Sequence, residues 1–196
     1  MSQLHPLPDA GVTASPFGVL LVIAHPAMER SRANKAMETA AVGAPGVTLL
    51  DLYETYPDFA IDVPAEQKRL LACRCVVVQF PLYWYSTPAL LKEWFDLVWL
   101  HGFAYGRGGT ALKGKRMMAA CSTGGCAEAY GREGSNRFTI EEFLRPLEQT
   151  AALCGMDWEA PFVLHASAVK DEATLEREAQ DYRRRLLALA QKAAAA

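Results

Sequence analysis

The chain has 196 residues, which suits one domain of ordinary size and is short for two. Hydrophobic residues make up 51% of the chain and charged residues 21%, a balance that excludes a disordered protein. The 20 basic side chains nearly balance the 22 acidic ones, giving a formal net charge of −2. No nucleic-acid partner is therefore expected.

The N-terminal segment and the cysteines bear on where the protein works. Residues 1–16 contain no Lys or Arg and no long apolar run, so they predict a flexible arm and not a signal peptide. Residues 17–196 predict a single domain, in which no apolar run approaches the about 18 residues of a membrane helix. The odd number of cysteines, with no C-x-x-C pair, is typical of a reducing compartment. We therefore expect a cytoplasmic protein, and peripheral docking at the inner membrane through a partner stays open. The cysteines are Cys73, Cys75, Cys121, Cys126 and Cys154.

The first half of the chain predicts strands that alternate with helices. Residues 17–24 read FGVLLVIA, a continuous apolar run expected of a parallel strand that is buried on both faces. Ser31 suits the N-cap of a helix over residues 31–42. The other elements expected in this half are a strand over 47–50, a helix over 65–72 and a strand over 75–80.

The second half continues this alternation. Thr87 predicts an N-cap with Pro88 at the first helical position, and this helix is expected to reach about residue 100. Gly155 is expected to end a helix over residues 140–154. The other elements expected here are strands over 115–121 and 158–164 and a closing amphipathic helix over 171–190.

This order of elements predicts an α/β fold with a doubly wound, five-stranded parallel sheet. The number of units fits the flavodoxin-like strand order 2-1-3-4-5, in which a ligand binds beyond the carboxyl ends of the first and third strands. The Gly-rich segment 102–114 is too long for a simple turn, so we expect a functional or oligomeric role for it.

The segment after the first strand is the first candidate for ligand binding. It begins with His25, and residues 31–34 (SRAN) then open the next helix. A helix N-terminus binds anions through free backbone N–H groups, and Ser31, Asn34 and His25 could add donors. The alternative is that Ser31 is only a cap and His25 only a loop residue. The sequence contains no G-x-G-x-x-G, so a Rossmann dinucleotide turn is not expected.

Two further loops end at the same predicted edge of the sheet. Residues 82–85 (LYWY) place three adjacent aromatics after the third strand, which favours a wall for a flat ring; a hydrophobic plug or a dimer contact is the alternative. Residues 122–125 (STGG) follow the fourth strand, and the two glycines would allow a close approach to a ligand and a positive φ. A plain tight turn would also use Gly124 and Gly125.

These segments together carry a family resemblance. In order, AHP…SRAN, FPLYWYSTPALLKEWFD, GFAYGRGGTALKGK and STGG resemble the NAD(P)H:quinone oxidoreductase family of flavodoxin-like proteins. The resemblance spans roughly residues 18–190. Within the family, the chain is most similar to the ancillary subunit of bacterial glutathione-gated potassium efflux systems.

The resemblance implies a flavin site and the residues that form it. FMN is the expected cofactor, with FAD as the alternative, and NAD(P)H is the co-substrate. Tyr130 and Asn136 match the catalytic positions, although the family has His where this chain has Asn136, and Asn cannot deliver a proton. The implied cofactor-binding residues are His25, Ser31, Arg32, Ala33, Asn34, Leu82, Tyr83, Trp84, Tyr85, Ser122, Thr123, Gly124 and Gly125.

The expected activity is ping-pong transfer of two electrons, as hydride, from NAD(P)H through the flavin to a quinone. The family is dimeric, and the helix over 88–100 has an apolar face wider than one sheet contact needs, so Trp94 is expected at a homodimer interface. A regulatory subunit that binds and activates a potassium efflux system is the alternative function. A one-electron flavodoxin carrier is a further alternative, although such a carrier would usually be shorter and much more acidic than this chain with its net charge of −2. His101 and His165 are expected to be structural, and no metal site is expected.

Overall fold

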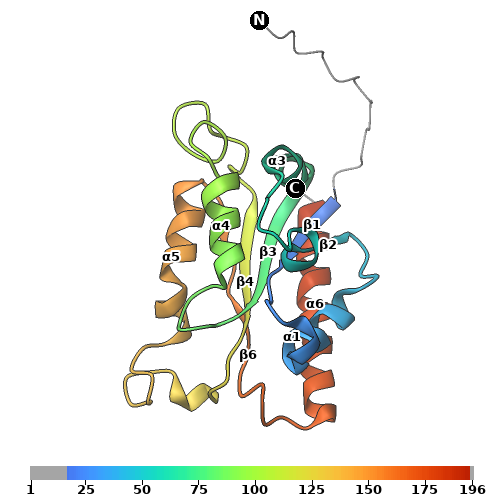
Figure 1. Cartoon of the computed structure of the whole chain (residues 1–196), viewed down its shortest axis with the longest axis vertical. Helices are drawn as coiled ribbons and strands as arrows, with labels where there is room; N and C mark the ends of the chain where they lie inside the picture. Colours follow the sequence, from blue (N-terminus) through green and yellow to red (C-terminus); the bar gives the residue numbers. More distant parts are fainter. Residues whose placement is uncertain (1–16, 195–196) are drawn as a thin grey trace, which may run out of the picture.

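A computed structural model describes residues 17–194, so the arm expected over 1–16 lies outside the described residues. A parallel sheet stands in the middle, in the order β2-β1-β3-β4-β5, and β6 also pairs with β4 (Figure 1). The flavodoxin-like strand order expected from the sequence is confirmed. The strands are β1 (Phe17–Ile23), β2 (Val47–Asp51), β3 (Cys73–Pro81), β4 (Arg116–Ser122), β5 (Asp157–Trp158) and β6 (Phe162–Leu164).

Helices cover both faces of this sheet and enclose two apolar cores. One core lies under α1 and α6, and the other lies under α2, α3, α4 and α5 (Figure 1). The short helix α2 was not expected; the Asp51 carboxylate caps it by accepting the backbone N–H groups of Tyr53 and Glu54. The helices are η1 (Met28–Arg30), α1 (Arg32–Ala41), α2 (Leu52–Thr55), α3 (Val63–Ala72), α4 (Ala89–Val98), η2 (Ala127–Ala129), α5 (Ile140–Leu153) and α6 (Glu172–Ala194).

The expected strand over 158–164 is interrupted, and a bulge separates β5 from β6. Trp158 pairs with Met117 and Phe162 pairs with Ala120, so three steps along β4 face four steps along its partner. Pro161 lies inside this interval and has no N–H to contribute to the sheet. One extra residue is therefore accommodated beside the sheet.

The expectation about the start and the exposed face of α4 was wrong. Pro88 itself occupies the N-cap position, and no side chain caps the helix, so Thr87 is not the cap. The apolar face that was expected to pack in part against a second subunit is buried inside this one chain, because α4 packs against α2 and α3 as well as against the sheet. Trp94 is fully buried, and its indole N–H donates to the buried Glu66 carboxylate at 3.0 Å. The apolar residues of this face, all buried, are Leu90, Leu91, Trp94, Phe95, Val98 and Trp99.

The strand register places the ends of β1, β3 and β4 at one edge of the sheet. Ile23 lies opposite Gln79, and Pro81 lies opposite Ser122, so the segments that follow these strands leave the sheet side by side. The buried Gln79 amide donates to the carbonyl of Asn34 at 3.0 Å and ties α1 to this edge. Among residues 17–194, no helix is long and apolar enough to span a membrane.

Candidate functional site

A cleft of about 590 Å³ lies at the carboxyl edge of the sheet, where the three loops meet. It brings together residues from the loop after β1, the start of α1, the loop after β3 and the end of β4. Arg30, which the sequence analysis did not single out, adds a second guanidinium beside Arg32. The expected cofactor-binding residues that line this cleft are His25, Ser31, Arg32, Ala33, Leu82, Tyr83, Ser122, Thr123 and Gly124.

The first turn of α1 is held against β4 by side-chain hydrogen bonds. Ser31 caps the helix, as expected, by accepting the backbone N–H of Asn34 at 3.1 Å. The Asn34 amide donates to Ser31 Oγ at 3.2 Å and to Ser122 Oγ at 2.9 Å. Asn34 is only 1% exposed and does not line the cleft. Its amide nitrogen therefore bridges α1 and β4, and the ligand contact expected for Asn34 stays a prediction.

His25 is positioned as a neutral hydrogen-bonding group. Its Nδ1 accepts the backbone N–H of Ala27 at 3.1 Å, which places the proton of the neutral ring on Nε2. Nε2 lies 3.3 Å from the Tyr83 hydroxyl, so that hydroxyl can accept from the ring and direct its own proton elsewhere. Burial lowers the pKa of His25, against the opposing effect of Glu29. The positive charge at this end of the cleft therefore comes from Arg30 and Arg32, which in this structure form ion pairs with Glu29 at 3.6 Å and with Glu172 at 2.9 Å.

A second cleft of about 370 Å³ adjoins the first and shares Leu82 and Gly124 with it. The two expected catalytic residues, Tyr130 and Asn136, both line this second cleft. The Tyr85 hydroxyl donates to Asn136 Oδ1 at 3.1 Å, which leaves the Asn136 amide N–H groups free to act as donors. The structure thus brings the expected aromatic and catalytic residues together.

The aromatic segment forms a tight turn that projects its side chains outward. Ser86 N–H donates to the Tyr83 carbonyl at 2.9 Å, and Trp84 and Tyr85 have φ values of 49° and 63°. These left-handed conformations define a type I′ turn, which non-glycine residues adopt at a cost of about 1–2 kcal/mol each. Trp84 is 93% exposed, so the hydrophobic-plug alternative does not apply to it. Strain and exposure together indicate a wall prepared for a ligand or a partner.

The two glycines after β4 act differently from one another. Neither has a positive φ, so that part of the expectation was wrong. A Cβ on Gly125 would lie 3.2 Å from Tyr130 Cε2, whereas a Cβ on Gly124 would meet no protein atom within 4 Å. A side chain at Gly125 would therefore displace Tyr130 by a few tenths of an ångström, and Gly124 leaves open the space shared by the two clefts.

Several backbone N–H groups point away from protein acceptors at this edge. Among residues 17–194, the amides of Trp84, Tyr85, Gly124 and Gly125 donate to no backbone or side-chain acceptor. Such free donors, beside apolar and aromatic walls, suit a flat polar ring with carbonyl groups at its edge. The adjoining helix N-terminus and two arginines suit a phosphate.

Comparison with known proteins agrees with this geometry. A sequence model of the flavodoxin-like fold family matches residues 18–186. The chain belongs to that family. Among its relatives, the glutathione-regulated potassium-efflux system ancillary protein KefF of Citrobacter koseri is 44% identical over 170 residues, covering 87% of this chain and 96% of the relative.

Solved structures resemble this flavodoxin-like protein over nearly their whole length. General stress protein 14 of Treponema denticola, solved in complex with FMN, is 39% identical with a TM-score of 0.83, covering 88% of this chain and 99% of that one. An NADPH-quinone reductase from P. pentosaceus is 32% identical with a TM-score of 0.79, covering 86% and 96%. A protein described as a thermophilic tryptophan halogenase from Streptomycin violaceusniger is 46% identical with a TM-score of 0.84, covering 86% and 98%.

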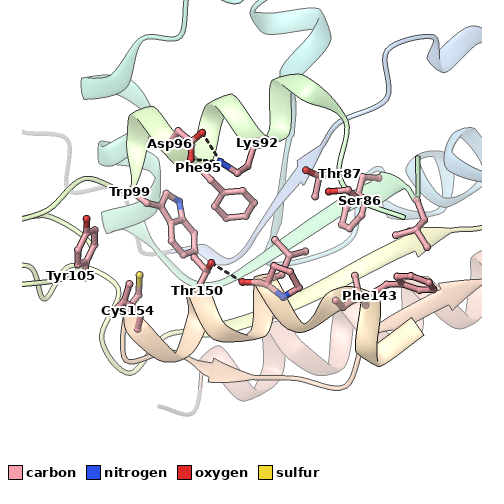
Figure 2. Close-up of a pocket in the computed structure, with 16 residues that line it drawn as sticks. Ser86, Thr87, Lys92, Phe95, Asp96, Trp99, Tyr105, Phe143, Thr150 and Cys154 are labelled. Atoms are coloured by element: carbon pink, nitrogen blue, oxygen red, sulfur yellow. Dashed lines mark hydrogen bonds and ion pairs between the residues drawn. The ribbon is translucent and has the colours of Figure 1, made fainter. Parts of the chain in front are cut away.

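An apolar pocket of about 380 Å³ lies beside the site, between α4 and α5. Figure 2 shows Phe95 of α4 and Trp99, the C-cap of α4, on one side of it and Phe143 and Thr150 of α5 on the other, with the Lys92–Asp96 ion pair at its edge. Of the expected site residues, it is lined by Leu82 alone. Its polar groups do not converge on one point, so we place the chemistry in the two clefts at the sheet edge and not here.

The thiols contribute little to the site. Burial raises the pKa of Cys73 to about 11 and the pKa values of Cys75 and Cys121 to about 12, so these three remain protonated and unreactive. Cys126, next to Gly125, is the exposed one among the cysteines. Within residues 17–194, no group of three or more His, Cys, Asp or Glu side chains could hold a metal ion.

Proposed function

We propose that this chain is a flavin-dependent NAD(P)H:quinone oxidoreductase that binds FMN without a covalent bond. The observation that carries the proposal is the junction of the two clefts, where free backbone donors, exposed aromatic rings and the expected catalytic residues meet. The FMN complex and the quinone reductase among its structural relatives support the same assignment. Bound flavin would supply hydride chemistry, which no side chain of the protein can provide.

The protein's own residues would bind and orient the reactants. The N-terminus of α1, with Arg30 and Arg32, would hold the flavin phosphate. Tyr83 and Trp84 would contact the ring system, and the free amides of Gly124 and Gly125 would bind its polar edge. Those amides would stabilise negative charge on the ring, because preorganised N–H dipoles favour the charged form.

Tyr130 and Asn136 would orient the quinone in the second cleft. The Tyr130 hydroxyl and the Asn136 amide are both hydrogen-bond donors, and a quinone carbonyl is an acceptor. Asn136 has no titrating group, so it can orient a substrate but cannot deliver a proton to it. The proton must reach the quinone from another group or from solvent.

The cofactor is tested by releasing the chromophore from the purified protein and identifying it by mass. We expect FMN, and FAD would overturn only the choice of cofactor. Purified protein that is colourless and takes up neither flavin in a titration would overturn the proposed function. Steady-state rates with NADH, NADPH and a quinone should then show the parallel lines of a ping-pong reaction. Tryptophan and halide, added as a control, should give no halogenated product.

We also propose that the protein is a homodimer in the cytoplasm. With Trp94 buried, the apolar residues that remain available near α4 and α5 are Leu97, Leu100 and Leu153, which are 38%, 46% and 60% exposed. Leu153 also lines the pocket between α4 and α5, which would extend the contact. Sedimentation measurements on the purified protein test the oligomeric state.

The identity with the potassium-efflux ancillary protein favours a second candidate function. In this function the flavoprotein docks on a membrane-embedded efflux system at the inner membrane and activates it. The test is to measure potassium efflux from vesicles that contain the efflux protein, with and without this chain. Activation that persists in a variant without quinone reductase activity would separate regulation from catalysis.

A further inference from the structure

His165 follows β6 directly and contacts the glycine loop after β4. Its Nδ1 lies 3.0 Å from Thr123 Oγ1, and the same Thr123 hydroxyl lies 2.9 Å from the Gly125 carbonyl. Backbone bonds join the same two segments, since Ala166 N–H donates to the Gly125 carbonyl at 2.8 Å. His165 is thus connected to the loop that supplies the free amides of the candidate flavin site.

Counting donors fixes the tautomer of His165. The Thr123 hydroxyl has one proton, and the Gly125 carbonyl can only accept. Both contacts become hydrogen bonds only if the hydroxyl donates to the Gly125 carbonyl and accepts from His165 Nδ1–H. The neutral ring therefore carries its proton on Nδ1, and Nε2 is the nitrogen that gains a proton when the ring becomes charged.

The same imidazole ring also contacts Tyr130. The two ring centroids are 5.6 Å apart with an interplanar angle of 42°, within the range in which a cation is attracted to an aromatic face. A separate cleft of about 470 Å³ is lined by His165 and by Cys126, Glu128, Lys170 and Glu178, and gives the ring access to solvent protons. One imidazole thus joins the glycine loop, the candidate catalytic tyrosine and solvent.

We propose that His165 is the titrating residue that positions this site: its Nδ1–H holds the Thr123–Gly125 loop, and protonation at Nε2 strengthens that hydrogen bond and fixes Tyr130. His165 would thereby give flavin binding a pH dependence that Asn136 cannot provide. The inference rests on the proposed flavin function. His165 acts through Thr123 and Tyr130, so it is a positioning residue and not a catalytic one.

Burial and the charged groups around His165 together set the direction of its pKa shift. Burial lowers its pKa most, followed by the positive charge of Lys170 in the segment before α6. The carboxylates of Glu178 in α6, Glu128 in η2 and Glu141 in α5 oppose this shift. The net effect lowers the pKa, so we expect the transition on the acidic side of about 6.5, the ordinary histidine value. Below it, FMN should bind about fivefold more tightly, the factor that corresponds to roughly 1 kcal/mol of added hydrogen-bond and cation–π energy.

Two variants of His165 separate the hydrogen bond from the charge. His165→Asn keeps an N–H near the position of Nδ1 but cannot titrate, and His165→Phe keeps a ring but has no donor. His101→Asn is the matched control, because His101 is exposed and lies outside both clefts. FMN dissociation constants are measured for each full-length protein by flavin fluorescence from pH 5 to 8.5, and ¹⁵N spectra of the flavin-free protein report the tautomer.

We expect the Nδ1–H tautomer in the flavin-free protein. We also expect a fivefold change in the FMN dissociation constant with pH, which is lost in both His165 variants and kept in His101→Asn. His165→Asn should bind FMN as the wild type does above the step, whereas His165→Phe should bind it several-fold more weakly at every pH. By linkage, FMN should raise the proton affinity of His165 by the same factor by which protonation tightens FMN binding, so the pKa of His165 rises by the logarithm of that factor.

A pH step that persists in His165→Asn, or an Nε2–H tautomer in the flavin-free protein, would overturn the inference about His165. Wild-type FMN binding by His165→Phe across the whole pH range would also overturn it. Failure of the wild-type chain to bind any flavin would instead overturn the proposed function, and the tautomer measurement would still report the His165–Thr123 contact.

Discussion

Trp94 and Trp99 provide a matched test of a buried hydrogen bond in α4 and its C-cap. Both indoles are buried, at 0% and 5% exposure, and the rings are in contact with centroids 5.9 Å apart. The Trp94 N–H donates to Glu66, whereas the Trp99 N–H has no hydrogen-bond partner among residues 17–194. The two tryptophans therefore differ mainly in whether the N–H is satisfied.

Replacing each tryptophan with Phe removes a similar volume but different hydrogen bonding. A hydrogen bond to a charged group contributes roughly 1.5–3 kcal/mol, so Trp94→Phe should lose about that much more stability than Trp99→Phe. In Trp99→Phe, removal of an unsatisfied buried donor offsets part of the packing loss. For a protein of this size, the difference corresponds to a melting temperature about 3–12 °C lower for Trp94→Phe.

The assay is chemical denaturation of both variants, followed by fluorescence and circular dichroism, with sedimentation run in parallel. We expect Trp94→Phe to lower the free energy of unfolding and to leave the oligomeric state unchanged. Equal losses in the two variants would show that the Glu66 hydrogen bond contributes nothing measurable. Dissociation of an oligomer by Trp94→Phe, with normal stability, would mean that Trp94 lies at an interface after all.

Four further predictions concern the site and the interface. Gly124→Val should keep the circular dichroism spectrum but reduce flavin affinity at least about 100-fold. A Cβ at position 124 meets no protein atom within 4 Å, so the valine side chain fits the fold but would fill the space between the clefts; normal flavin occupancy would contradict this. Tyr130→Phe should keep flavin and lower kcat/KM for the quinone about tenfold, and unchanged kinetics would place the loop of residues 126–137 outside the substrate site. Leu100→Glu should shift sedimentation towards monomers, and an intact dimer would exclude this edge of α4 from the interface. The pKa values of His25 and His165 are lower in the folded state than in the unfolded chain, so the unfolded chain binds more protons below about pH 6.5. The free energy of unfolding should therefore fall as the pH drops through that range. In a double variant, His25→Asn with His165→Asn, denaturation curves at several pH values should show a weaker dependence of this free energy on pH.

The sheet order and the positions of the three loops could be predicted because each depends on local patterns. The apolar runs in β1 and β3 require strands buried on both faces, and Ser31 is a cap that needs only its own helix. Parallel strands then bring their carboxyl ends to one edge, so the clustering of the loops follows from the fold.

What the sequence could not reveal depends on contacts between distant segments. The sequence of α4 does not show that α2 and α3 cover its apolar face. Trp94 was therefore expected to contact a second subunit, whereas it packs inside its own chain. No pattern predicts that the Asn34 amide would donate to Ser122. The position of His165 beside Thr123 likewise depends on the register of β6 against β4.

The bulge between β5 and β6 determines which lengths of this short connection preserve the fold. Trp158 faces the core under α4 and α5, and Val163 faces the same core although an uninterrupted strand would turn it to the opposite side. Deleting one residue of 160–161 would leave three steps facing three along β4, so the inward and outward faces of everything that follows, including the buried Leu164, would be kept. Deleting two residues would leave two steps to span three and would break the pairing. A library of length variants should therefore retain folded protein at the native spacing and at one residue fewer, and should lose it at two residues fewer.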